Sequence, residues 1–320
     1  GSASAAAAAV GSMVREGEEE QGYDPALCAA TNGASAPAGL LIPPSNALIT
    51  YSLVSGGTSV AALFLAGYIP GIIWSACCIL VAVMIAKRNG YQGIPGKFDW
   101  QNLLCATLRA IPALSLIIVV IGGIIIGVFT ATEGSAIAVV YALILSICYR
   151  SLSWKTFWHI VTDSAKMSGM IVFLIGVSNI MGWVMAFTQI PQAISAALLG
   201  LTDNSVIILL IMNGILLIAG TFMDVTPAIL IFTPLFLPVV KTFGMSPIQF
   251  GLILVYNLCI GNITPPVGNT LFVAIKVGKT SLARVMPHML VYYIAILAGL
   301  LLVTYVSAVS LTLPMIAGML

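Results

Sequence analysis

Long apolar stretches are the feature that most constrains what this chain can fold into. Five of them, at residues 60–86, 110–129, 135–149, 167–187 and 285–306, contain no Asp, Glu, Lys or Arg. A helix needs about 20 apolar residues to cross the roughly 30 Å hydrocarbon layer of a bilayer. Only 7% of the 320 residues are charged, too few to cover a water-exposed surface. The sequence therefore predicts an all-α polytopic membrane protein and excludes a soluble enzyme.

Several other functions lack the residues they need. The net charge is only +2, and no cluster of Lys and Arg is present to neutralise nucleic-acid phosphates. No GxxxxGK[ST] loop occurs, so we expect no ATP-driven motor in this chain. The six cysteines lack metal-ligand spacing, and we interpret them as small apolar residues: Cys28, Cys77, Cys78, Cys105, Cys148 and Cys259.

Four further apolar runs are short or interrupted. Residues 3–14 form a half-length run, and the runs 25–41, 205–219 and 247–260 stop at polar or proline-containing segments around 42–44, 220–221 and 262–266. A broken helix inside a bilayer leaves backbone groups without partners, which is tolerated where the break is buried in protein or lines a wet cavity. These breaks are therefore where we expect the functional site.

The basic residues predict the orientation of the chain in the membrane. A single threading places ten of the twelve on one side, which the positive-inside rule assigns to the cytoplasm: Arg15, Lys87, Arg88, Lys97, Arg109, Arg150, Lys155, Lys276, Lys279 and Arg284. Lys166 falls near a membrane end and Lys241 on the opposite side. Residues 91–104 and 152–161 combine aromatic and charged side chains, and we expect them to form helices lying in the interface.

The interrupted segments contain an internal repeat. Shifting the chain by 222 positions aligns identical residues without a gap: Gly22, Pro25, Gly39, Pro43, Pro44, Gly56, Thr58, Ser59 and Ala61 with Gly244, Pro247, Gly261, Pro265, Pro266, Gly278, Thr280, Ser281 and Ala283. Most of these are residues that bend or break helices. A plain packing role for the prolines and glycines is the alternative.

The threading predicts that the two copies are inverted. The first copy runs outward from residues 15–23 and breaks at Pro43-Pro44, whereas the second starts outside near Lys241 and breaks at Pro265-Pro266. Residues 205–240 form a re-entrant hairpin that precedes the second break. Of the matching first hairpin we expect only the tip at residues 1–4 and the return arm at 5–14. Inverted repeats with re-entrant hairpins and broken helices are typical of secondary transporters whose site lies near the midplane.

Oxygen-bearing side chains gather at both breaks, as a cation site requires. We predict sodium binding by Ser2, Ser4, Gly39, Ser45, Asn46, Thr221, Asp224, Thr226, Gly261 and Thr264, and substrate binding by Ser35, Pro43, Pro44, Asn257, Asn262, Pro265, Pro266 and Asn269. Asp224 stands out because a carboxylate buried in an apolar run is costly without a cation. Capping of a helix by Asp224 is the alternative. The half-helices after Pro44 and Pro266 point positive dipole ends inward, which suits an anionic substrate.

The remaining ionisable residues favour structural roles. Glu133 follows Thr130 at the spacing of a helix-capping box, which we prefer over substrate contact. Asp163 lies beside Lys166, as in an ordinary surface pair. His159 and His288 have no evident acidic or cysteine partner, so neither metal binding nor nucleophilic catalysis is expected. The chain is therefore not expected to be an enzyme.

Several motifs in fixed order resemble one transporter family. These are residues 1–5 (GSASA), 22–25 (GYDP), 39–45 (GLLIPPS), 129–133 (FTATE) and Pro234 through 262–268 (NITPPVG). Across essentially the whole chain they resemble the large membrane subunit of TRAP transporters, the tripartite ATP-independent periplasmic transporters, of sialic acid or C4-dicarboxylate type. This sequence departs from the family pattern at the acidic run 16–20, where relatives often carry basic residues. Such subunits also begin with further helices, ahead of the part that this chain resembles.

The resemblance implies a function and its partners. It implies an elevator-type, Na⁺-coupled subunit that imports an organic anion, a sialic acid, dicarboxylate or sugar acid, across the bacterial inner membrane. It also implies a small membrane subunit, possibly fused, and a periplasmic substrate-binding protein, with Na⁺ as coupling ion and no organic cofactor. By position, the cation and substrate regions fall on the hairpin tips and broken helices.

The predicted organisation alternates moving and static segments. Residues 1–59 and 203–282 form the transport domain, and 60–111, 112–202 and 283–320 supply the scaffold. Three alternatives remain: a Na⁺- or H⁺-coupled anion transporter that works without a binding protein, a channel, and an intramembrane enzyme. A channel would favour continuous polar-faced helices, and an enzyme would need a nucleophile or metal set.

Overall fold

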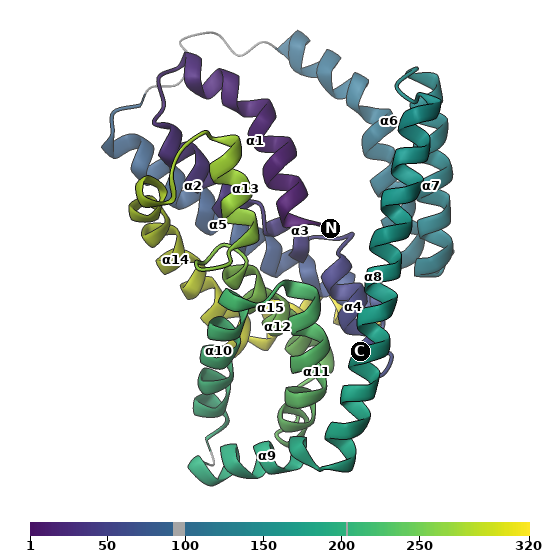
Figure 1. Ribbon diagram of the computed structural model, residues 1–320, viewed down its shortest axis with the longest axis vertical. Helices are drawn as coiled ribbons and strands as arrows, with labels where there is room; N and C mark the ends of the chain where they lie inside the picture. Colours follow the sequence, from purple (N-terminus) through teal and green to yellow (C-terminus); the bar gives the residue numbers. More distant parts are fainter. Residues whose placement is uncertain (92–99, 203) are drawn as a thin grey trace. The chain divides into compact units, whose positions relative to one another are not determined.

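The computed structural model describes residues 1–91, 100–202 and 204–320 (Figure 1). The described residues form fifteen helices and no strand: α1 (Ala3–Glu20), α2 (Pro25–Ser35), α3 (Ala38–Leu41), α4 (Asn46–Val54), α5 (Val60–Arg88), α6 (Trp100–Ile125), α7 (Ala131–Cys148), α8 (Trp154–Phe187), α9 (Ile190–Leu201), α10 (Ser205–Phe222), α11 (Val225–Thr242), α12 (Pro247–Gly261), α13 (Asn269–Val277), α14 (Leu282–Tyr305) and α15 (Ser307–Ile316). The all-helical prediction is confirmed.

Seven of these helices are long and apolar enough to cross a membrane: α5, α6, α7, α8, α10, α11 and α14. The five predicted spans all lie within this set, and the two arms of the predicted hairpin, α10 and α11, complete it. Of the interfacial segment predicted at residues 152–161, residues 154–161 form the first turns of α8, which runs continuously from Trp154 to Phe187, and their position in the interface stays a prediction. Of the other predicted interfacial segment, residues 100–104 are the first turn of α6, and residues 92–99 lie outside the described part.

The helices fall into two compact units, Gly1–Ile94 with Met181–Leu320, and Pro95–Ile180. The smaller unit contains α6, α7 and most of α8. There α6 and α7 pack through Tyr141, whose hydroxyl lies 3.0 Å from the carbonyl oxygen of Pro112 and 2.7 Å from Ser115 Oγ. At the start of α7, Thr130 and Glu133 form the predicted capping box, with Thr130 N donating to Glu133 Oε2 at 2.8 Å. Glu133 is thus committed to the helix terminus.

The larger unit carries the internal repeat. The offset of 222 residues places Ala3 and Glu20, the ends of α1, on Val225 and Thr242, the ends of α11, and it places the start of α5 on that of α14. Gly22 and Gly244, which follow the paired hairpin arms, both have a positive φ, 72° and 77°. Pro43-Pro44 and Pro265-Pro266 are both cis. The repeat predicted from identities is therefore also a repeat of backbone structure.

The packing within this unit follows the same repeat in opposite directions. In Figure 1, α1 rises from the N-terminal label whereas α11 descends towards α9. Helix α1 packs on α13 of the second copy, and its counterpart α11 packs on α4 of the first. Likewise, α2 packs on α14, and α12 packs on α5. The opposite directions of α1 and α11, together with these contacts between the copies, are those expected of an inverted pair.

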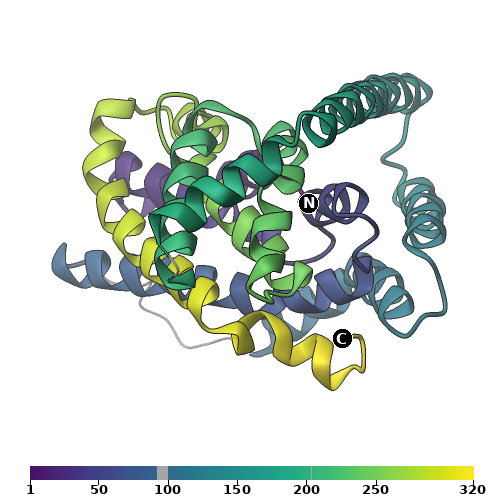
Figure 2. The same ribbon diagram turned by 90° about the horizontal axis from the view of Figure 1, so that it is seen from below.

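Helices α5 and α14 are held tightly to the broken helices. Trp74 of α5 is fully buried, donates Nε1 to the carbonyl oxygen of Ala34 at 2.9 Å, and meets the ring of Tyr256 edge-on at 4.9 Å. The hydroxyls of Tyr292 on α14 and Thr31 on α2 lie 2.7 Å apart. Figure 2 shows α14 and α15 along one side of this unit, where both contact α5. The larger unit therefore includes helices that the sequence assigned to a scaffold.

Helix α1 is longer than its apolar run suggested. The predicted return arm ended at residue 14, but the helix continues through the charged stretch to Glu20. Arg15 supports this extension because its Nε and Nη2 donate to Glu19 Oε1, one turn away, at 2.7 and 2.6 Å. Such a pair at i and i+4 is a modest stabiliser of an exposed helix, about 0.3–0.5 kcal/mol.

Candidate functional site at the helix breaks

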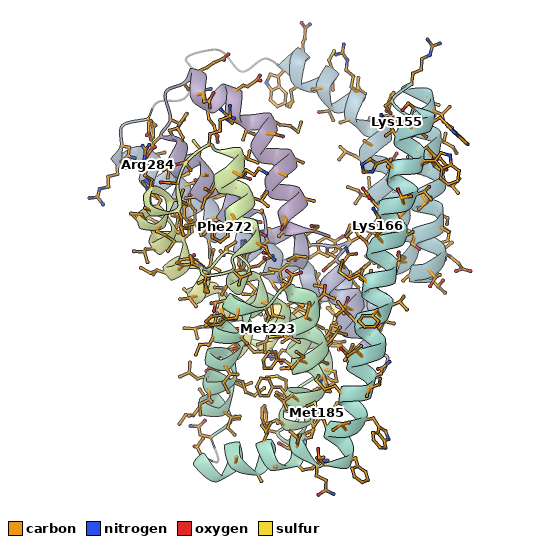
Figure 3. The ribbon with its side chains drawn as sticks, viewed as in Figure 1. Lys155, Lys166, Met185, Met223, Phe272 and Arg284 are labelled. Atoms are coloured by element: carbon orange, nitrogen blue, oxygen red, sulfur yellow. The ribbon has the colours of Figure 1, made fainter. Side chains whose placement is uncertain are left out.

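The second break, residues 262–268 between α12 and α13, lies directly against the tip of the α10–α11 hairpin. Two glycines permit this approach: a Cβ on Gly261 would come within 2.3 Å of the backbone of Gly220. The backbone N of Val267 in the break donates to the carbonyl oxygen of Thr221 at 3.2 Å. The prediction that hairpin and break face one another is therefore confirmed for the second copy. Figure 3 labels Met223 at the tip and Phe272 on α13.

Asp224 stands at the N-terminus of α11 with its carboxylate exposed. The expectation that it is buried in an apolar run is wrong, because α10 ends at Phe222 and Asp224 is an exposed residue of the turn between α10 and α11. Its side chain makes no capping hydrogen bond to the described backbone. Its polar partner is Asn269, whose Nδ2 donates to Asp224 Oδ1 at 3.4 Å. The carboxylate therefore remains available to a ligand, and it is joined to the first residue of α13.

The hydroxyls around the second break are partly committed to their own helices. Thr264 Oγ1 donates to the carbonyl oxygen of Ile260 at 2.7 Å, and Thr221 Oγ1 to that of Ile218 at 2.7 Å. Both oxygens can still accept or coordinate with their lone pairs. The hydroxyl of Tyr293 on α14 donates to the carbonyl oxygen of Ile263 at 2.6 Å. The break is thus held from three sides, by α10, α12 and α14.

The first break, residues 42–45 between α3 and α4, meets the start of the chain. A Cβ on Gly1 would lie 3.0 Å from the carbonyl oxygen of Pro44 and 3.3 Å from the backbone N of Asn46. Ser45 is fully buried, donates its hydroxyl to the carbonyl oxygen of Leu40, and accepts from the backbone N of Leu48 at 3.3 Å. Ser45 is therefore the N-cap of α4. Because its hydroxyl already makes two hydrogen bonds, we do not expect it to be a main ligand of a cation.

The first hairpin arm reaches across to the second broken helix. Ser4 Oγ lies 3.4 Å from Thr270 Oγ1, and Thr270 is fully buried in the first turn of α13. Ser2 caps α1 by accepting from the backbone N of Ala5 at 3.3 Å. Sequence reasoning missed Thr270. Its position directly after Asn269 was the available signal.

Exposure divides the remaining predicted residues into two groups. Ser2, Pro44, Asn46, Pro266 and Asn269 are exposed at the breaks and tips. Others are buried or half-buried: Ser35, which donates to the carbonyl oxygen of Asn32 at 3.2 Å, Gly39 on α3, Pro43 in the first break, Thr226 on α11, Gly261 at the end of α12, and Asn262 and Pro265 in the second break. The exposed group contains the side chains that a ligand can reach without rearrangement.

Asn257 lies in a buried polar network rather than facing the break. Its Nδ2 donates to Asn213 Oδ1 of α10 at 2.9 Å, and Asn213 Nδ2 donates to Thr304 Oγ1 of α14 at 3.0 Å. Gln249 Nε2 adds a bond to the carbonyl oxygen of Thr304 at 3.1 Å. Asn257 Oδ1 has no partner among the described residues. Asn213 was missed, although it is an isolated amide within the apolar run of α10.

The histidines do have acidic partners, contrary to prediction. His159 Nδ1 lies 2.8 Å from Asp163 Oδ2, one helical turn away, and Lys166 lies 3.7 Å from the same carboxylate, as expected for a surface pair. His288 Nε2 lies 3.5 Å from Asp24 Oδ2 at the N-terminus of α2. The second contact joins residues far apart in sequence and could not be read from spacing. No group of three potential metal ligands occurs in the part of the chain that the structure describes.

An apolar pocket of about 460 Å³ opens beside the second hairpin tip. Its lining comes from α10, α12 and α14: Leu217, Ile218, Thr221, Phe222, Ile260, Thr264, Tyr293 and Leu297. Thr221 and Thr264, the two hydroxyls that border the tip contact, are also the polar part of its wall. Asp224 is not among these lining residues. The hairpin tip therefore has the apolar pocket on one side and the exposed carboxylate of Asp224 outside that pocket.

Inverted broken helices, a hairpin tip seated on a break, and seven apolar spans define a polytopic membrane transport protein. The chain belongs to the family described as the DctM component of tripartite ATP-independent periplasmic transporters, whose family model matches residues 1–309. It is therefore a large permease of TRAP type, a multi-pass protein of the inner membrane and not an enzyme.

Its relatives cover nearly the whole chain. It is 47% identical to the protein YgiK of Salmonella typhimurium, over 98% of this chain and 72% of that protein. The isethionate TRAP transporter permease protein DctMQ of Oleidesulfovibrio alaskensis is 37% identical, over 97% of this chain and 49% of that protein. The C4-dicarboxylate TRAP transporter large permease protein DctM of Pseudomonas aeruginosa is 35% identical, over 100% and 74%.

Proposed function

We propose that this permease couples the entry of Na⁺ to the import of a small organic anion, which a periplasmic binding protein delivers. The observation that carries the proposal is the Asp224 carboxylate, exposed at a hairpin tip, free of capping bonds to the described backbone and joined to Asn269 across the second break. A carboxylate at membrane depth is costly unless a cation or donors neutralise it.

The second break supplies the other oxygens that a hard cation needs. Backbone carbonyls freed by a broken helix, together with hydroxyl and amide oxygens, form such cages in transporters. Asn269 donates to Asp224, Thr221 and Thr264 border the contact between tip and break, and Gly261 brings the backbone of α12 against the tip. At the first break we propose a second, uncharged set of oxygens from Ser2, Ser4 and Asn46. The offset of 222 residues places Ser2 on Asp224 and Ser4 on Thr226.

The half-helices favour an anion next to these cations. The first residues of α4 and α13 are Asn46 and Asn269, and both have exposed amide side chains. Helix N-termini carry a partial positive charge and unpaired N–H groups, which stabilise carboxylate and related groups. Substrate and Na⁺ then share one neighbourhood, so that binding of one neutralises the charge of the other.

Two relatives support the substrate class. One is named for isethionate, a sulfonate, and another for C4-dicarboxylates. Their shared chemistry is a small organic anion, which is therefore what we propose for this chain. As in a tripartite transporter, we propose that a small membrane subunit and a periplasmic binding protein work with it.

We further propose that the helices of the larger unit move together, as in an elevator. Helices α5 and α14 are tied to α12 and α2 by buried contacts, including Trp74 with Ala34 and Tyr292 with Thr31. Separating these pairs would leave buried polar groups unpaired at each step of a cycle. The boundary of the moving body then follows the division of the chain into two compact units rather than the ends of the broken helices.

Replacement of Asp224 by Asn tests the coupling. The permease, reconstituted with its partner subunit and binding protein, is expected to lose most of its Na⁺ activation in Asp224→Asn, because the neutral amide no longer balances a cation. Asp163→Asn is the matched control, since Asp163 lies in a surface cluster of the smaller unit. Unchanged Na⁺ activation of the Asp224→Asn variant would remove this carboxylate from the ion site.

A further inference from the structure

A second cavity, of about 340 Å³, lies at the corner between α7 and α8 in the smaller unit. We call residues 149–153, which join the two helices, the α7–α8 corner. The cavity is lined by Leu143 and Ile147 of α7, Leu152 and Ser153 of the corner, and Trp154 and Phe157 of α8. Its wall is almost entirely apolar, so it is shaped for hydrocarbon and not for a polar solute.

The backbone fixes the shape of this corner. The N of Arg150 donates to the carbonyl oxygen of Ile147 at 3.0 Å, and the N of Ser151 to that of Ser146 at 3.0 Å. Ser153 Oγ then accepts from the backbone N of Thr156 at 3.1 Å, which caps the start of α8. The cavity is therefore a built feature of a hydrogen-bonded turn.

An aromatic cluster stands at the mouth of the cavity. The ring of Trp154 stacks on that of Phe157 at 5.8 Å, and Trp158 meets Trp154 edge-on, also at 5.8 Å. Trp154 and Trp158 are 74% and 51% exposed. Exposed tryptophans of this kind belong to the headgroup level of a bilayer, where the ring is amphipathic.

The charge at the corner is positive. Arg150 and Lys155 are exposed and form no ion pair with a described residue. No acidic residue occurs between Glu133 and Asp163, and Asp163 is already paired with His159 and Lys166. Figure 3 labels Lys155 at the end of α8, away from Lys166. Two unpaired cations therefore flank an apolar cavity.

We propose that the α7–α8 corner is a binding site for an anionic phospholipid of the cytoplasmic leaflet. An acyl chain fills the cavity between Ile147 and Phe157, and the headgroup phosphates lie against Arg150 and Lys155. The positive-inside rule places these two residues at the cytoplasmic face, where anionic headgroups attract each nearby Lys or Arg. The bound lipid anchors the smaller unit at that face.

Quenching of tryptophan fluorescence by brominated lipid tests the proposal. The permease with its partner subunit is reconstituted in phosphatidylcholine vesicles that contain a minor fraction of brominated phosphatidylglycerol. The difference in quenching between the unaltered permease and the Trp154→Phe/Trp158→Phe variant gives the quenching that comes from the two tryptophans at the corner. In Arg150→Gln/Lys155→Gln we expect the apparent affinity for phosphatidylglycerol to fall about fivefold for each charge removed. Arg109→Gln/Lys166→Gln, which removes the same charge elsewhere, is expected to leave it unchanged.

Filling the cavity gives an independent variant. Ile147 is 65% exposed, so the larger side chain of Ile147→Phe is tolerated by the fold, adds no tryptophan to the signal, and is expected to abolish the preference for phosphatidylglycerol. Three results would overturn the proposal. The Arg150/Lys155 variant and its control could have equal affinity for phosphatidylglycerol, or brominated phosphatidylcholine could quench the corner tryptophans as strongly as brominated phosphatidylglycerol. The third is that neither brominated lipid quenches these tryptophans because the partner subunit covers the corner.

Discussion

At the scale of single residues, the site depends on how closely backbones approach at the second break. Gly220 and Gly261 let α10 and α12 touch where the hairpin tip meets the break. The polar network that follows, from Asn257 through Asn213 to Thr304, then joins the same two helices to α14. Neither feature carries charge, and both hold α10, the helix that leads to Asp224, against α12.

Gly261→Ala is expected to destabilise the protein. The new Cβ would lie 2.3–2.5 Å from backbone atoms of Gly220, so the hairpin must shift, at a cost of about 1–3 kcal/mol. Gly214→Ala is the matched control, because a Cβ there meets no described atom within 4 Å and alanine favours a helix. Thermal unfolding in mild detergent measures both. Equal stability of the two variants would contradict the close approach.

The buried network is expected to show coupling between Asn213 and Asn257. A double-mutant cycle with Asn213→Leu and Asn257→Leu isolates their hydrogen bond, because each single variant removes one partner of that bond while Asn213 keeps its bond to Thr304 and Asn257 its bond to the carbonyl oxygen of Ile253. Hydrogen bonds between membrane helices average about 0.6 kcal/mol and reach about 1.7 kcal/mol. We expect a value toward the upper end, since both residues are nearly or fully buried. A coupling energy of zero would show that the contact is incidental.

At the scale of helices, the fold is an inverted repeat with crosswise packing. Helix α1 packs on α13 as well as on α2, and α11 packs on α4 as well as on α12, so each of these hairpin arms contacts the broken helices of both copies. The helices after the breaks, α5 and α14, pack on the broken helices as well. A displacement of either hairpin therefore acts on both breaks.

Cross-linking tests whether α2 and α14 move as one body. Asp24 and Arg284 bridge these helices at 3.5 Å near the predicted cytoplasmic face. In a background without the six native cysteines, a bifunctional maleimide between Asp24→Cys and Arg284→Cys is expected to leave transport intact. The two single-cysteine variants control for labelling alone. Loss of transport only in the cross-linked double variant would show that α14 slides past α2 and belongs to the scaffold.

The breaks could be predicted from the sequence because proline and glycine act locally. Pro43-Pro44 and Pro265-Pro266 interrupt helices wherever they occur, and their common offset revealed the repeat. Tertiary contacts could not be found this way. The partner of His288 is Asp24, and that of Ser4 is Thr270, each more than 250 residues away. The exposure of Asp224 was also missed, because hydropathy cannot tell an exposed turn from a buried run.

At the scale of the whole molecule, the two compact units carry different tasks. The larger unit holds both breaks, the three hairpin arms α1, α10 and α11, and the pocket beside the tip, and the smaller unit holds the α7–α8 corner. In the proposed cycle the larger unit carries Na⁺ and the organic anion together. In this proposal the charge on Asp224 makes the two binding events interdependent, so that neither ligand alone is expected to give efficient transport.

Uptake driven by an imposed Na⁺ gradient tests this account most directly. Vesicles that contain the permease and its partner subunit, supplied with the binding protein loaded with its organic anion, receive an inward Na⁺ gradient or an equal gradient of K⁺. The account predicts accumulation of the anion against its own gradient with Na⁺ and none with K⁺. Uptake that ignores the Na⁺ gradient and follows only the gradient of the anion would contradict coupled transport.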